Sequence, residues 1–330
     1  MWTRHKAVIV VAAVIVLAGL VTGVLFALLG GQAKNASATP SDTAELRSPF
    51  TGEPVRVLNP VLAVKIDNIV HARPQTGLTH ADIVYVLPVE GGLSRFLAIF
   101  SSGYPPVVGP VRSAREDDLQ VLRQFGRPAF AYSGATPALL RYIHRSARIV
   151  DLYAGTARGY YRDNSRVAPY NLYAHTGQLL AQAPGASRAR DIGFRFGPPP
   201  PGGIVTGSAS VSYPAASFKF TWSAAKGRWL VSMDGAAAVT TDGGPLAPAT
   251  VVIQHTTVRT SRFLEYGKPP PFAESVGSGT AEVLRDGKAW MTHWSRPDAE
   301  AGTTFTTTTT TSGQPMTFAT GQVWIVLAYP

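Results

Sequence analysis

Residues 83–100 read IVYVLPVEGGLSRFLAIF, two apolar runs joined across Gly91-Gly92. Their β-branched and aromatic residues are typical of strands, and the paired glycines permit a tight turn between them. We therefore predict strands at residues 83–88 and 93–100. A third run, residues 61–66, precedes them, so the three strands are expected to form a meander.

A helix is predicted soon after this meander. Ser113 can cap its free amides, and Glu116, three residues later, can reach back as in a capping box. Leu119 and Leu122 supply an apolar stripe, and Gly126 is a suitable C-terminal stop.

Two further helices and a linker complete the first half of the soluble region. Thr136-Pro137 combines a good N-cap with a proline that the first helical turn tolerates, and a short helix is expected near Thr176. Residues 198–203 read PPPPGG, which cannot continue a helix and lacks amides for a sheet. We therefore expect a domain boundary there, between residues 48–205 and 206–330.

The second half has an all-β pattern. Strands are predicted at residues 218–223, 229–233, 250–255, 280–284, 289–294 and 323–328. Asp286-Gly287 is a hairpin signal, and the uncharged tract 303–311 favours an edge strand or an O-glycosylated loop. The tryptophans could form a carbohydrate platform, but at strand spacing most of Trp222, Trp229, Trp290, Trp294 and Trp324 are expected in the core. The predicted fold class is α+β, an N-terminal mixed α/β-meander domain followed by a smaller, mostly antiparallel β domain.

An apolar segment precedes these domains. Residues 7–29 are long enough, at about 1.5 Å per residue, to cross a hydrocarbon core of about 30 Å. The basic residues 4–6 place the N-terminus in the cytoplasm. A cleaved signal peptide ending at residues 36–38 is the alternative, but its apolar core would be shorter. We expect residues 1–30 to be a cytoplasmic stub and one transmembrane helix, and residues 31–47 a flexible tether, in a single-pass cell-membrane protein whose soluble domains lie outside the cell.

Composition narrows the classes of function. The chain has no cysteine, which excludes disulfides, thiolate metal sites and thiol enzymes. Residues 48–210 carry seventeen Lys or Arg against ten Asp or Glu, and most of the basic residues are Arg. The guanidinium fork suits carboxylate and phosphate, so an anionic ligand, wall polymer or lipid headgroup is expected, unless the arginines are simply solvated or paired internally. The sequence contains no basic run with interleaved aromatics, which is the pattern that would indicate nucleic-acid binding.

Five motifs occur in a fixed order in the first half. They are KIDN at 65–68, RPQTGL at 73–78, ADIVY at 81–85, EGG with RF at 90–96, and GPVRSAR at 109–115. In this order they resemble the YerB-like family of bacterial envelope lipoproteins, and RDGK at 285–288 is similar to the family's C-terminal domain. The resemblance implies an envelope location and a two-domain architecture, but no activity. Because no Cys is available for lipid attachment, we expect the apolar segment to tether the protein instead.

The motifs concentrate arginines and carboxylates at strand ends and turns, where functional groups are usually displayed. Arg112 and Arg115 also flank the positive end of the first predicted helix, which favours an anion. Alternatively, Asp67 and Glu90 pair with the arginines in a buried network. The aromatic loop 160–173 would suit stacking on a sugar or peptide plane, or is packed down by its own tyrosines. The candidate ligand-binding residues are Asp67, Asn68, Arg73, Gln75, Glu90, Arg95, Arg112, Ser113, Arg115, Tyr161, Arg162 and Asn171.

Most catalytic chemistries find no support in the sequence. The histidines never occur at the i, i+4 spacing of a zinc peptidase, and no nucleophile elbow, phosphate-cradling loop or dinucleotide fingerprint is present, so no metal and no cofactor are expected. Glu90 and Asp67 are the best pair for glycoside cleavage, but nearby arginines would lower the pKa of both carboxyls. We expect a binding or scaffold protein of the bacterial envelope that holds an anionic or saccharide ligand. A cell-wall glycan hydrolase and a protein-interaction module of an envelope complex are the alternatives.

Overall fold

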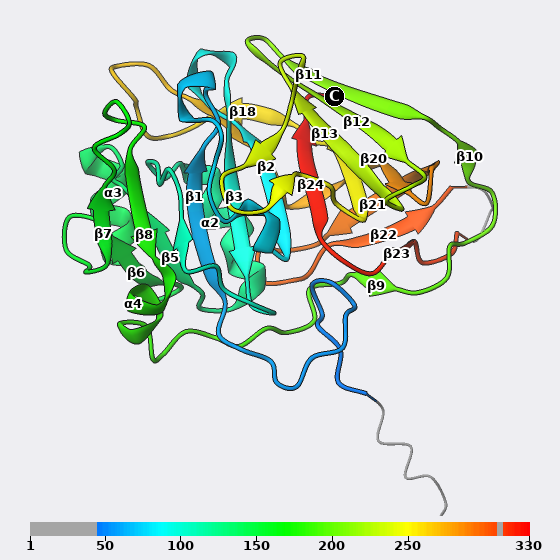
Figure 1. Ribbon diagram of the computed structural model, residues 1–330, viewed down its shortest axis with the longest axis horizontal. Helices are drawn as coiled ribbons and strands as arrows, with labels where there is room; N and C mark the ends of the chain where they lie inside the picture. The colour runs from blue at the N-terminus through cyan, green and yellow to red at the C-terminus, as the bar shows by residue number, and fades with distance from the viewer. Residues whose placement is uncertain (1–44, 309–312) are drawn as a thin grey trace, which may run out of the picture. The chain divides into compact units, whose positions relative to one another are not determined.

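One large mixed sheet runs through both halves of the sequence (Figure 1). The computed structural model describes residues 45–308 and 313–330. The sheet contains β1 (Leu62–Asp67), β2 (Ile83–Pro88), β3 (Ser94–Phe100), β5 (Ala129–Tyr132), β6 (Val150–Tyr153), β10 (Ile204–Val205), β17 (Thr250–His255), β20 (Gly277–Arg285), β21 (Lys288–Arg296), β22 (Thr304–Thr307) and β24 (Val323–Ala328). Its order is β10-β21-β20-β17-β24-β2-β3-β1-β5-β6, and β22 also pairs with β21. β2 and β3 are antiparallel neighbours, but β1 pairs with β3 and not with β2, so the expected meander of these three strands is wrong.

The predicted membrane segment, residues 7–29, lies outside the described residues, as does most of the predicted tether. Among residues 45–308 and 313–330, no helix is both long and apolar enough to cross a membrane. Glu45–Pro330 forms one compact unit. The last residues of the expected tether already belong to it, because Arg47 forms a β-bridge with Pro54.

The C-terminal strand joins the two halves. All six residues of β24 are buried, and the strand runs parallel to β17 on one side and to β2 on the other. Strands buried on both faces read as continuous apolar runs, which is why VWIVLA is so clear in the sequence. The expected mostly antiparallel pattern is therefore wrong for this strand. The predicted boundary, residues 198–203, is a largely exposed connection between β9 (Arg195–Phe196) and β10.

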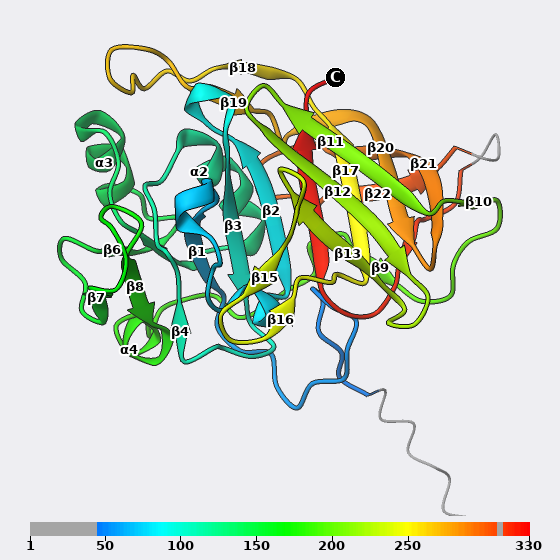
Figure 2. The ribbon, with the colours of Figure 1, turned by 45° about the horizontal axis from the view of Figure 1, so that its top comes forward.

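Alternate residues of the central strands enter two different cores. Val84 and Val86 of β2 belong to the core on one face of the sheet. A smaller antiparallel sheet covers that face, as Figure 2 shows, with Phe218 and Trp229 packed in the same core. Its strands are β11 (Ser208–Tyr213), β12 (Ala216–Ser223), β13 (Arg228–Met233) and β14 (Ala236–Ala237).

Helices cover the other face. Ile83 and Tyr85 of β2 lie in the second core together with Val121 of α2 (Glu116–Leu122) and Ile143 of α3 (Pro137–His144). The helix predicted after Thr136 is confirmed, and so is α4 (Thr176–Ala181). The remaining elements are β4 (Val107–Val108), β7 (Tyr160–Arg162), β8 (Leu172–His175), β15 (Val239–Thr240), β16 (Gly244–Pro245), β18 (Val258–Thr260), β19 (Pro271–Ala273), β23 (Thr317–Phe318), η1 (Val70–Ala72), η2 (Leu78–His80), η3 (Glu90–Gly92) and η4 (Arg123–Phe125).

The predicted capping box at the start of α2 is wrong. The helix begins at Glu116, and the Asp118 carboxylate accepts a hydrogen bond from the Arg115 amide at 2.7 Å. Glu116 instead accepts from the hydroxyl and amide of the segment at Ser261 and Arg262. Two acidic residues lie near the start of the helix. Because Glu116 is bound by Ser261 and Arg262, Asp118 is the one that accepts the backbone amide there.

The hairpin and core predictions of the second half are confirmed. Asp286 and Gly287 have φ values of 49° and 69°, as a type I′ turn requires, and they connect β20 to β21. Part of the threonine tract forms the edge strand β22, and residues 309–311 of the tract lie outside the described residues. Four tryptophans are at most 2% exposed, namely Trp229, Trp290, Trp294 and Trp324. These side chains fill the interior and are not available as a carbohydrate platform.

Candidate functional site

Three segments converge at one end of the large sheet. Asp67 is the last residue of β1 and lies opposite Arg95 of β3. The segment before α2 runs alongside, because the Arg112 amide donates to the Lys65 carbonyl at 2.8 Å. The local fold therefore brings together motifs that lie far apart in the sequence.

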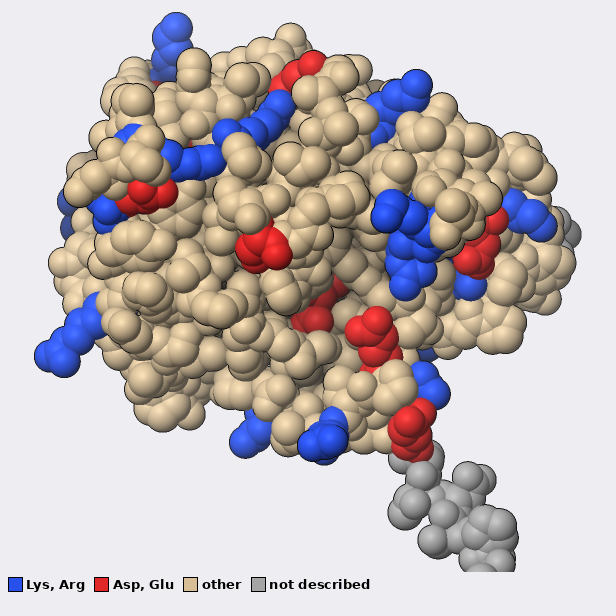
Figure 3. All heavy atoms as spheres, in the orientation of Figure 1, with Lys and Arg blue, Asp and Glu red and all other residues tan. Residues whose placement is uncertain are grey.

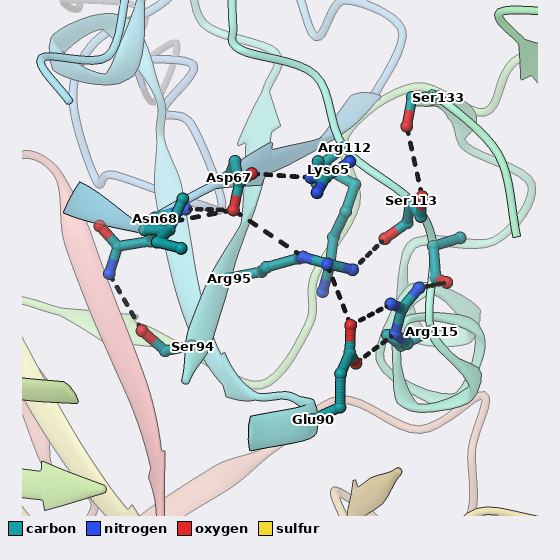
Figure 4. Close-up of polar contacts among 12 residues, drawn as sticks. Lys65, Asp67, Asn68, Glu90, Ser94, Arg95, Arg112, Ser113, Arg115 and Ser133 are labelled. Carbon is teal, nitrogen blue, oxygen red and sulfur yellow. Dashed lines mark hydrogen bonds and ion pairs between the residues drawn. The ribbon is translucent and has the colours of Figure 1, made fainter. Parts of the chain in front are cut away.

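Asp67 is the centre of the first group of contacts (Figure 4). Its Oδ2 accepts from Arg112 Nε at 2.7 Å, and its Oδ1 accepts from the Asn68 amide at 2.9 Å. Arg95 Nε lies 3.9 Å from Oδ1. The carboxylate is buried, so these partners compensate the loss of water around its charge.

Glu90 is the centre of the second group. Its Oε2 accepts from Arg115 Nε at 2.8 Å, and its Oε1 accepts from Arg95 Nη2 at 3.1 Å and from Arg115 Nη2. Burial acts to raise the pKa of Glu90, but the Arg115 hydrogen bonds and the charges of Arg95 and Arg115 outweigh it and lower the pKa to about 2. Glu90 is therefore ionised near neutral pH and unsuited to act as the protonated acid of a glycoside hydrolase.

Both arginines of this group are occupied within the protein. Arg115 also lies 3.3 Å from Glu265, and Arg95 Nη1 donates to the Ser113 carbonyl at 3.1 Å. Burial, followed by the charge of Arg115, lowers the pKa of Arg95 to about 10. The alternative of a buried Arg–carboxylate network thus describes Arg95 and Arg115, which leave little room for a ligand.

Three other predicted residues hold the loop after β1. Gln75 Nε2 donates to the Asp67 carbonyl and to Asn68 Oδ1, both at 3.1 Å. Arg73 Nη2 donates to the Asn68 carbonyl at 2.7 Å and lies 2.8 Å from Asp234. These side chains hold the backbone of the loop after β1 in position. They do not together line an open surface.

One buried ion pair was not predicted. Lys65 Nζ lies 2.6 Å from Asp118 Oδ1, and both side chains are completely buried. The neighbouring Asp117 is also buried, and burial, followed by the Asp118 charge, raises its pKa to about 7. The available signal was a lysine inside the otherwise apolar run of β1, because a buried lysine is almost always paired.

An open hollow lies beside the network, and we call it the Arg112 pocket. Its volume is about 430 Å³. It is lined by Val111, Arg112, Ser133, Tyr153, Ala154, Gly155, Tyr160, Tyr161, Arg162, Pro169 and Leu172, with no carboxylate among them. The sequence had singled out Arg112, Tyr161 and Arg162, whereas Ser133 and Tyr153 carried no signal because they come from the ends of separate strands.

The aromatic loop gives this pocket its far wall. Tyr161 stacks on His175, with ring centroids 5.0 Å apart, and Arg162 Nη1 donates to Asn171 Oδ1 at 2.7 Å. Arg112 is the most open of the network arginines, with 23% of its side chain exposed, and it lies 5.6 Å from the Tyr170 ring. Ser113, predicted as a ligand residue, instead places its hydroxyl 3.4 Å from Ser133 Oγ.

Charged side chains also occur away from this pocket. On the face drawn in Figure 3, Lys and Arg side chains occur in small groups, and Asp or Glu lies beside several of them. In the described part of the chain, no group of three or more His, Asp or Glu residues is arranged to hold a metal ion. The geometry therefore gathers arginine and tyrosine side chains around one pocket.

Known proteins share both halves of this architecture. Residues 50–189 match the protein of unknown function (DUF3048) N-terminal domain, and residues 209–325 match the DUF3048 C-terminal domain. The chain is 40% identical over 128 residues to the "Putative lipoprotein YerB" of Bacillus subtilis, an alignment that spans 38% of this chain and 38% of that protein. The crystal structure of Bacillus subtilis YerB has a TM-score of 0.72 at 22% identity, covers 86% of this chain and 97% of that one, and shows the same fold. The resemblance drawn from the motifs is confirmed, and the chain belongs to the YerB-like DUF3048 family.

Proposed function

We propose that this chain is a membrane-attached binding protein of the bacterial cell envelope that holds an anionic saccharide in the Arg112 pocket. The location is supported by the lipoprotein name of the Bacillus subtilis relative and by the apolar segment at residues 7–29. The ligand class is supported by the pocket itself.

The observation that carries the proposal is the lining of the pocket. Arg112 and Arg162 bring guanidinium groups to the lining, and Tyr153, Tyr160 and Tyr161 bring aromatic rings, while the Tyr160 hydroxyl donates to the Leu152 carbonyl. Aromatic faces pack against the apolar side of a sugar ring, and arginines bind carboxylate in a bidentate manner. Without a lining carboxylate, the pocket does not repel an anion.

The hydrolase alternative is weakened by the same geometry. Glycoside cleavage requires one carboxyl that carries a proton, but Glu90 has a pKa of about 2. Asp67 is bound to Arg112 and buried. Neither carboxyl lines the Arg112 pocket, so the pocket is suited to holding a glycan rather than cutting it.

The test is retention of the full chain, purified in detergent, on insoluble peptidoglycan, followed by titration with soluble muropeptides. Tyr161→Ala and Arg162→Ala are expected to weaken binding about tenfold or more each, since a hydrogen bond to a charged group contributes roughly 1.5–3 kcal/mol. Both side chains are exposed, so the fold is expected to survive. Arg56→Ala removes an exposed arginine that does not line the pocket, and serves as the matched control.

Equal retention of the wild type and both pocket variants would overturn the proposal, as would no retention of the wild type. If the chain instead captures an envelope protein while ignoring muropeptides, the interaction-module alternative replaces it.

A further inference from the structure

A second basic hollow lies on another part of the molecule, and we call it the arginine groove. It consists of two adjoining hollows of about 530 Å³ and 250 Å³, which share Leu119, Arg123 and Tyr142. Its walls come from α2, α3 and the loop that connects β18 to β19, which extends toward α3 in Figure 2. The arginines that line it are Arg123, Arg141, Arg145, Arg148, Arg259 and Arg262.

The arginines of the groove outnumber the carboxylates that pair with them. Arg123 and Arg148 share Glu300, while Arg262 pairs with Glu116 and Arg259 with Glu274. Within the described part of the chain, Arg141 and Arg145 form no ion pair. Six arginines thus face three carboxylates, whereas Arg95 and Arg115 of the first network are buried and neutralised.

The groove differs from an ordinary solvated surface because aromatic rings hold two of its arginines in place. The Arg262 guanidinium lies 4.9 Å from the Tyr142 ring centroid and 5.1 Å from that of Phe263. Arg259 lies 3.7 Å from the Phe272 ring centroid. Each of these two guanidiniums also pairs through Nε with a carboxylate, Arg262 with Glu116 and Arg259 with Glu274. Stacking and pairing together fix the position of the guanidinium, which reduces the entropy that ligand binding would cost.

We infer that the arginine groove binds a linear polymer that carries phosphate groups at intervals along its chain. Two adjoining hollows accommodate consecutive units of a chain better than one small anion, and a concave surface fits a chain better than a flat bilayer. The guanidinium edges of Arg141 and Arg145, which form no ion pair within the described residues, match a phosphate in a bidentate manner. This site is separate from the Arg112 pocket, so the inference goes beyond the function proposed above.

The experiment compares the affinity of the full chain in detergent with that of two double variants. The probe is inorganic polyphosphate of defined length that carries a fluorescent label. Arg141→Ala/Arg145→Ala removes two exposed charges of the groove and is expected to weaken binding at least tenfold and to reduce its dependence on salt. Arg56→Ala/Arg158→Ala removes two exposed charges outside the groove, and little change is expected. Arg162→Ala changes the Arg112 pocket and not the groove, so it tests whether the groove binds polyphosphate independently of that pocket.

Two further probes separate the alternatives. Polygalacturonate offers carboxylates instead of phosphates and is expected to bind more weakly than polyphosphate. Vesicles of phosphatidylglycerol offer phosphates on a flat surface, and because residues 7–29 can insert into them, the vesicle experiment compares the wild type with Arg141→Ala/Arg145→Ala, for which equal binding is expected. Comparable binding of polygalacturonate, or a loss of vesicle binding in the variant as large as its loss of polyphosphate binding, would overturn the inference. So would an equal loss in the two double variants, because attraction would then depend on net charge alone.

Discussion

The buried pair of Lys65 and Asp118 gives the sharpest test of how this fold is held together. Nζ lies 2.6 Å from Oδ1, and neither side chain is exposed. Lys65→Met keeps a long unbranched side chain but removes the charge, so the Asp118 carboxylate loses its cationic partner inside the protein. Removing one member of a buried pair costs about 3–5 kcal/mol, because the remaining charge cannot recover its water.

The matching double variant, Lys65→Met/Asp118→Asn, removes both charges. The side-chain amide oxygen introduced at position 118 can still accept the hydrogen bond that the Arg115 amide donates to Asp118 at 2.7 Å in the wild type. Replacing a buried ion pair by uncharged groups is often close to neutral, so the double variant is expected to regain about 2 kcal/mol or more relative to Lys65→Met. The two changes are thus expected to be strongly non-additive.

Unfolding in urea, followed by tryptophan fluorescence, measures these differences, since four tryptophans are buried in the native state. The reasoning is refuted if Lys65→Met costs under about 1 kcal/mol, or if the double variant is less stable than Lys65→Met. Either result would mean that the charges are not isolated from water as the structure shows.

Two further predictions concern pH and a turn. Burial raises the pKa of Asp82 from about 3.8 to about 6, so its contribution to stability is fully present well below pH 4 and is lost as the pH rises through 6. Relative to Asp82→Asn, the wild type should gain about 2 kcal/mol between pH 7 and pH 4. Parallel pH profiles of the two proteins in urea unfolding would contradict this. Gly287 and Gly227 have φ values of 69° and 58°, but only a Cβ at Gly287 would meet Trp222, 2.8 Å away. Gly227→Ala should therefore cost about 1–2 kcal/mol and Gly287→Ala at least about 1 kcal/mol more, and equal melting temperatures of the two variants would sink the steric argument.

Local patterns in the sequence were sufficient for many of the longer strands and for the helices α2, α3 and α4. The strands predicted at 83–88, 250–255 and 323–328 have these bounds in the structure. Each is a short apolar run bounded by turn-forming or polar residues, and such a signal depends only on neighbours in the chain. Asp286-Gly287 was equally readable, because a two-residue turn with positive φ at both positions accepts few residue types.

Which side chains meet was decided by the tertiary structure. The motifs placed Glu90 and Arg112 in one region, but they did not indicate which arginines would be neutralised. Ser133 lines the pocket although it comes from the end of a strand that lies outside the motifs. The groove combines Arg141 of α3 with Arg262, which is distant in sequence.

Hydrophobic period and turn chemistry are properties of a few consecutive residues, so the sequence by itself determined many of the longer strands, the three helices, the family and the apolar segment at 7–29. Whether an arginine is paired or open depends on which carboxylate lies within about 4 Å of it. That distance follows from the pairing of strands such as β2 and β24, which no local pattern encodes. The tertiary structure alone therefore separated the buried, neutralised arginines around Glu90 from Arg141 and Arg145 of the arginine groove, which form no ion pair within the described residues.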